Sequence, residues 1–83
     1  MSELLNWKEE TIWGTVIRTL RIKNYLAVLI GDHVGTADEA WVGSVAVVSE
    51  EGMHHNVYQV PPTLSYTPAK LLVENYLIHA QVL

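Results

Sequence analysis

Residues 11–22, TIWGTVIRTLRI, decide the fold class, because their side chains alternate as those of a β-strand do. The even positions are apolar except for Arg18, and the odd positions are mixed and include Trp13. A two-residue period is typical of a strand with one buried face. Gly14 suggests a bulge or a close backbone approach within the stretch. We therefore expect one long strand that bends and contributes to two layers of a curled sheet.

Three further strands follow this stretch along the chain. Lys23 and Asn24 can turn the chain into an apolar run at 25–30, which we interpret as a strand, although its spacing also fits a helix. Residues 40–49 contain four valines, which lose rotamer freedom in a helix, so we expect a strand buried on both faces. A shorter strand at 55–60 ends where two prolines follow.

The two ends of the chain have weaker patterns. Residues 1–10 are compatible with a short helical arm. Thr67 followed by Pro68 favours a helix start, with threonine at the N-cap and proline at the first helical position. The alternation over 76–83 then predicts a final strand, and one long helix from residue 68 to the C-terminus is the alternative.

The expected fold is mainly β, in a single domain over residues 1–83. It is a small five-stranded curled sheet or SH3-like barrel with one short helix before the last strand. The resemblance to SH3-like barrels lies in the order of the elements alone and implies no function. The alternative fold is α+β with a long C-terminal helix.

Composition excludes several classes of protein. Apolar residues make up 49% and charged residues 17%, below the usual charged fraction of about 25%, which disfavours intrinsic disorder. Lys and Arg number 5 against 9 Asp and Glu, so nucleic-acid binding through phosphates is not expected. The chain has no cysteine, and its N-terminus lacks the apolar core of a signal peptide. No apolar run is long enough to span a bilayer. We therefore expect a cytoplasmic protein without membrane contact.

Motifs for catalysis or metal binding are not found in the sequence. His54 and His55 are adjacent, so on a strand they point to opposite faces, and the other two histidines lack metal-ligand spacing. No serine lies in a nucleophile motif. We expect no enzymatic activity, no cofactor and no metal.

The surplus of apolar and aromatic residues points to protein–protein contact. Mean hydropathy is +0.16, so a chain of this length is expected to expose an apolar patch. The chain has Trp and Tyr but no Phe, and interfaces favour the first two. We therefore expect a small non-catalytic interaction module, forming a homodimer or a subunit of a larger assembly. Sheet extension could use an edge at 25–30 or the C-terminal strand. The expected anchor residues are Trp13, Trp41, Tyr58 and Tyr76. The polar side of the strand suits an exposed Trp13, and packing in the second face of a small barrel is the alternative, while Trp41 suits a core position better than a surface one.

Two alternative functions also fit the composition. A small acidic inhibitor-type protein would bind a basic surface of a nucleic-acid-handling complex through the acidic pairs Asp38, Glu39, Glu50 and Glu51. A single-stranded nucleic-acid binder would use Trp13, Arg18, Arg21 and Lys23. A small enzyme or ligand-binding barrel is a further class, and the sequence indicates no pocket residues for it.

Overall fold

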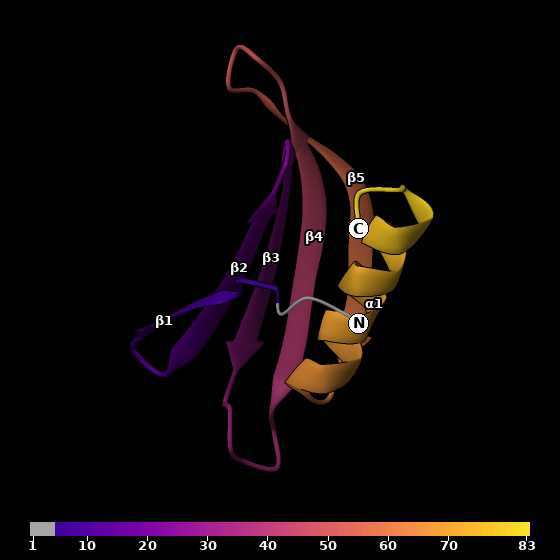
Figure 1. Ribbon diagram of the computed structural model, residues 1–83. Helices are drawn as coiled ribbons and strands as arrows, with labels where there is room; N and C mark the ends of the chain where they lie inside the picture. The colour runs from indigo at the N-terminus through magenta and orange to yellow at the C-terminus, as the bar shows by residue number, and fades with distance from the viewer. Residues whose placement is uncertain (1–4) are drawn as a thin grey trace.

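A meander of five antiparallel strands forms a single sheet, and one helix packs against one of its faces (Figure 1). The computed structural model describes residues 5–83. The elements are, in order, β1 (Lys8–Ile12), β2 (Thr15–Ile22), β3 (Tyr25–Asp32), β4 (Ala40–Val48), β5 (His54–Thr63) and α1 (Tyr66–His79). Each strand pairs with its neighbours in the chain, so β1 and β5 are the edges and β3 is central.

The mainly β fold and the five-stranded sheet predicted from the sequence are confirmed. The sheet remains open, because the two edge strands do not pair with each other. Strong twist rotates β1 and β2 away from the direction of β4 and β5 (Figure 1). Twist thus produces the expected curl without closing a barrel.

Residues 11–22 form a hairpin, so the prediction of one long bent strand with a bulge at Gly14 is wrong. Trp13 (φ 52°) and Gly14 (φ 80°) are both left-handed, and Ile12 pairs with Thr15 across them. Positive φ at both central residues matches the twist of a two-residue hairpin. Asn, Asp and Gly favour this turn, and a tryptophan at its first central position gives no turn signal in the sequence.

The other predicted strands lie close to where they were expected. β3 includes 25–30, and β4 agrees with 40–49 to within one residue. β5 includes 55–60 and continues through two prolines, which an edge strand tolerates because one side of it needs no donors. The predicted helical arm over 1–10 is wrong at 8–10, which belong to β1, and its residues 1–4 lie outside the described residues.

The chain ends in a helix, so the predicted strand over 76–83 is wrong. The short helix predicted from Pro68 is part of α1, and the alternative of a C-terminal helix holds. The helix begins two residues before Pro68, with Ser65 at the N-cap, which moves the start from the predicted Thr67. Gln81 (φ 61°) ends the helix. Its N–H donates to the carbonyl of Ile78 at 3.0 Å, and the N–H of Val82 donates to that of Leu77 at 2.9 Å. These two bonds define a Schellman motif.

The hydrophobic core lies between α1 and one face of the sheet. The helix buries Ala69, Val73 and Leu77, which are spaced four residues apart on one side. The sheet buries Leu20, Ala27, Leu29, Trp41, Val45 and Val60 against them. The Trp41 ring lies over Gly31, where a Cβ would stand 2.5 Å from the ring. Glycine at position 31 therefore makes room for the largest side chain of the core.

Candidate interaction surface

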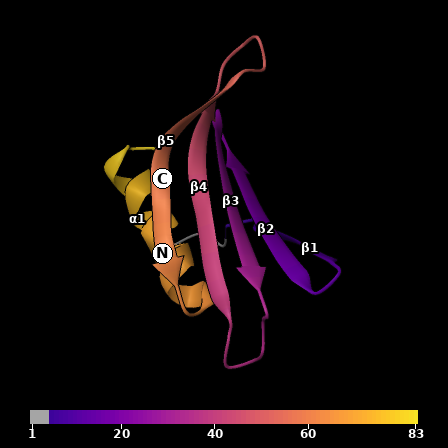
Figure 2. The ribbon, with the colours of Figure 1, turned by 180° about the vertical axis from the view of Figure 1, so that it is seen from behind.

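Strand register divides the side chains of the sheet between two faces. Arg18 lies opposite Leu29, and Leu20 lies opposite Ala27, so these residues share the helix-covered face. The alternate residues form the helix-free face, which Figure 2 shows with the sheet in front of the helix. No element of residues 5–83 covers that face (Figures 1 and 2). Its apolar residues are Ile17, Leu26, Val28, Ile30, Val42, Ala46 and Val48.

The helix-free face is apolar in its centre, where a solvated face would be polar. On β3, Leu26, Val28 and Ile30 are half-buried by their neighbours in the sheet, and on β4 Val42 is 42% exposed. An antiparallel sheet with one solvated face normally alternates apolar and polar side chains. β3 is instead apolar on both faces. The apolar surface is centred on β3, while the row through Val28 also contains Thr19, Ser44 and Gln59. Exposed apolar surface of this kind is typical of interaction sites.

Charged side chains lie along one side of this patch and are ordered along the strands. Glu10 lies opposite Ile17, Lys8 lies opposite Thr19, and Arg21 follows two residues beyond Thr19 on the same face. Among the described residues, neither Glu10 nor Arg21 forms an ion pair. Arg21 only donates from Nε to the carbonyl of Lys23, at 3.2 Å. Glu10 and Arg21 thus lie toward opposite ends of the strands, and Lys8 lies between them.

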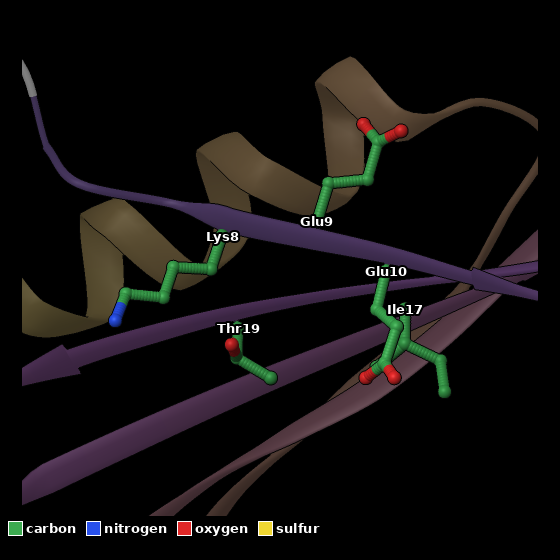
Figure 3. A pocket seen from close by; sticks show the side chains of 5 residues that line it. All are labelled: Lys8, Glu9, Glu10, Ile17 and Thr19. Carbon is green, nitrogen blue, oxygen red and sulfur yellow. The ribbon is translucent and has the colours of Figure 1, made fainter.

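A hollow of about 320 Å³ lies beside β1 and β2. It is lined by Lys8, Glu9, Glu10, Ile17 and Thr19. In Figure 3 the side chain of Glu9 extends to the opposite side of β1 from those of Lys8 and Glu10. The hollow therefore places a carboxylate, an ammonium and an aliphatic side chain together on the helix-free side of the hairpin.

The four predicted aromatic anchors have different environments. Trp13 is 99% exposed at the tip of the β1–β2 hairpin, so of its two predicted positions the exposed one holds. Trp41 is 1% exposed, so it lies in the core and offers no surface to a partner. Tyr58 and Tyr76 are half-buried and stack on each other, with ring centroids 4.9 Å apart and planes 7° apart. Only Trp13 presents its whole side chain to solvent.

The helix-covered face holds an aromatic and charged cluster that the sequence did not indicate. The guanidinium of Arg18 lies 4.0 Å from the centre of the Tyr66 ring and 2.7 Å from the Glu9 carboxylate. Trp7 meets the edge of the same ring and donates from Nε1 to Glu74 at 3.1 Å. These contacts join the β1–β2 hairpin and the preceding segment to α1. They account for the one charged residue on the otherwise apolar side of β2.

The acidic residues do not form one surface. Asp38 and Glu39 lie in the β3–β4 loop, and Glu50 and Glu51 lie in the β4–β5 turn, at the opposite end of the sheet (Figure 1). The N–H of Gly35, then the indole N–H of Trp41, donate to the Glu39 carboxylate and lower its pKa below the ordinary value. Glu39 therefore orders its loop from within the molecule.

The residues of the predicted nucleic-acid site are also separated. Arg18 lies on the helix-covered face, Arg21 lies on the helix-free face, and Lys23 lies at the opposite end of β2 from Trp13. No common groove therefore collects these side chains.

The edges predicted for sheet extension were misplaced. Residues 25–30 lie in β3, which is paired on both sides, and the C-terminal segment is α1. Only β1 and β5 have free edges. β1 reads KEETI and is fully exposed, and charged residues on an edge strand discourage further pairing. A partner therefore finds more apolar surface on the face of the sheet than along its edges.

Other kinds of site were also sought. Within residues 5–83, no three His, Cys, Asp or Glu side chains gather as they would to ligate a metal ion. The helix of this part of the chain is too short to cross a membrane. Comparison with protein families, with curated proteins and with solved structures finds no match to this chain. Function must therefore be inferred from the geometry of the surface.

Proposed function

We propose that this protein is a non-catalytic interaction module whose helix-free face packs against the same face of a second copy of the chain. One observation carries the proposal: β3 from Tyr25 to Ile30 is apolar on both faces, β4 is apolar on both faces except for Ser44, and the described residues cover only one face of the sheet. Strands that are apolar on both sides are typical of sheets with a layer on each face. A second sheet supplies the missing layer.

The size of the face favours a second copy of the same sheet. Five strands about 4.8 Å apart and about eight residues of roughly 3.3 Å give a projected area of about 600 Å². Two copies would together bury about 1,200 Å², which is the lower end of the range for specific interfaces. Sheets that pack face to face keep their strands within about 30° and lie about 10 Å apart. We expect a dimer of micromolar affinity.

Sedimentation or light scattering across a dilution series tests the proposal. The wild-type chain should show the mass of a dimer at high concentration and that of a monomer on dilution. Val28→Glu places a charge at the centre of the helix-free face and should leave a folded monomer throughout. Leu71→Glu introduces the same charge on the outer side of α1, where Leu71 is 52% exposed, and should leave the dimer intact.

The outcomes separate the two apolar surfaces of the molecule. A wild-type monomer at every concentration would overturn the proposal. A dimer that Leu71→Glu disrupts and Val28→Glu does not would assign the interface to α1 instead. Far-ultraviolet circular dichroism of both variants shows that each has folded before its mass is interpreted.

A further inference from the structure

We infer that the two copies pack with antiparallel strands, so that Glu10 of each lies against Arg21 of the other. This inference rests on the proposed self-association and adds its orientation. It draws on the order of charges along the helix-free face, on the hollow beside β1 and β2, and on the lack of Lys, Arg, Asp and Glu in β4 and β5.

Twofold symmetry allows two simple arrangements of one sheet face on itself. An axis along the strands stacks β1 over β5 of the second copy, with the strands running in the same direction. An axis across the strands stacks β1 over β1 and reverses the strand direction. The two arrangements bury the same apolar residues, so the charged side chains must distinguish them.

Glu10 and Arg21 cannot pair within one molecule. Glu10 lies opposite Ile17, and Arg21 is four residues further along β2, which separates the two by about 14 Å. Neither has an ion-pair partner among residues 5–83. The row that contains Lys8, Thr19 and Val28 lies midway between them. At an axis on this row the two copies of Lys8 face each other, two residues along β1 from the Glu10 carboxylates. An axis across the strands at this row exchanges the two ends and places Glu10 beside Arg21 of the second copy.

The hollow beside β1 and β2 can hold the proposed pair of Glu10 and the second copy's Arg21. Glu10 lines it together with Ile17, which can contact the aliphatic part of an incoming arginine. Arg21 is exposed, so its guanidinium is accessible to another molecule. In the antiparallel arrangement the side chain of Arg21 from the second copy enters the hollow and meets the Glu10 carboxylate. Symmetry repeats the contact, so each dimer contains two such pairs.

The parallel arrangement gives Glu10 and Arg21 no charged partner. It would place Glu10 over β5 and Arg21 over β4, and neither strand contains Lys, Arg, Asp or Glu. Both charges would then be partly desolvated without a partner, which is unfavourable. Charge complementarity therefore selects the antiparallel arrangement.

Mixing two charge-reversal variants tests this orientation. Glu10→Arg and Arg21→Glu each create two like-charge contacts in their own homodimer, so each should dimerise at least about tenfold more weakly than the wild type. An equimolar mixture of the two variants restores both contacts with reversed or native polarity. The mixture should form a heterodimer with an affinity within about threefold of the wild type. Glu51→Arg, which changes the same charge in the β4–β5 turn, is the matched control for Glu10→Arg.

Each result either supports or overturns the orientation. Dimerisation of Glu51→Arg like the wild type, together with recovery only in the mixture of the two face variants, supports it. Recovery in a mixture of Glu51→Arg with Arg21→Glu would attribute the effect to net charge and overturn it. Homodimers of Glu10→Arg and Arg21→Glu as strong as the wild type would also overturn it, while the dimer itself would stand. A wild-type monomer would remove the proposed function as well, so the two failures are distinguishable.

Discussion

The β1–β2 hairpin carries a glutamate and an arginine on each of its two faces, and the two pairs differ in their surroundings. On the helix-covered face, Glu9 and Arg18 form an ion pair at 2.7 Å, with the arginine stacked over Tyr66. On the helix-free face, Glu10 and Arg21 lie about 14 Å apart without ion-pair partners in the described chain. The first pair completes a contact between the sheet and α1. In the proposed dimer the second pair forms between the two molecules.

The same difference extends to the apolar residues of the sheet. On β3, Ala27 and Leu29 are at most 1% exposed because α1 covers them, while Leu26, Val28 and Ile30 lack a covering layer. Side chains of the same type thus contribute more to the stability of the monomer on the helix-covered face than on the helix-free face. Substitutions at matched positions can measure that difference.

The largest expected effect compares two leucines of the same strand. Leu29→Ala removes a fully buried side chain and should lower the free energy of unfolding by about 2–5 kcal/mol. Leu26→Ala on the helix-free face should lower it by about 1 kcal/mol or less when the chain is dilute and monomeric. Denaturant unfolding at low protein concentration measures both. Equal losses for the two variants would mean that the helix-free face is covered in the monomer.

A smaller effect separates the two arginines. Arg18→Ala removes the ion pair and the contact with the Tyr66 ring and should destabilise the monomer by about 1–2 kcal/mol. Arg21→Ala should leave monomer stability unchanged within about 0.5 kcal/mol and should weaken only self-association. Thermal unfolding of dilute samples gives the first quantity, and the mass on dilution gives the second. A destabilised Arg21→Ala monomer would contradict the comparison.

Substitution of Trp13 at the hairpin tip should raise the stability of the monomer and lower the affinity of the dimer. Trp13→Asn replaces a bulky side chain at φ 52° with a residue that favours this turn, and should stabilise the monomer by about 1 kcal/mol. The same variant should weaken the dimer, because the antiparallel arrangement lays this tip against the β2–β3 turn of the second copy. A more stable variant with unchanged dimer affinity would show that the exposed indole does not contact the partner.

The smallest expected effect is the pH dependence of stability that Glu39 causes in the β3–β4 loop, which lies outside both faces of the sheet. The hydrogen bonds from Gly35 and Trp41 lower the pKa of Glu39 in the folded protein below its ordinary value of 4.5. Its carboxylate therefore stabilises the fold above that value, and the contribution is lost as the pH falls through the lowered pKa. Melting temperatures of the wild type and Glu39→Gln should differ at neutral pH and converge below pH 4.5. A constant difference across this range would contradict the assignment.

Local sequence patterns predicted most of the strands. The hairpin tip and the C-terminal helix depend on tertiary contacts that these patterns do not show. The apolar runs at 25–30 and 40–49 identified β3 and β4, because each is apolar on both faces. The hairpin tip was missed because Trp13 is an unusual residue for a left-handed turn. The C-terminal helix was predicted only as the alternative, because residues 76–83 alternate like a strand. The four-residue spacing of Ala69, Val73 and Leu77 was the signal that identifies the helix.

The candidate surface was only partly predictable. An exposed apolar patch followed from composition, whereas the exposure of Trp13 results from its place at the hairpin tip, which the strand pattern did not indicate. The position of the patch depends on which face α1 covers, and that is settled by packing between distant segments. The charges on the helix-free face share no local motif, because Glu10 and Arg21 are related only through strand register.

The mass of the wild-type chain in solution across a dilution series tests the central claim most directly. The helix-free face as a self-association surface predicts a dimer at high concentration that dissociates reversibly at micromolar concentrations, and a monomer for Val28→Glu throughout. A wild-type chain that remains monomeric at the highest accessible concentration would contradict it.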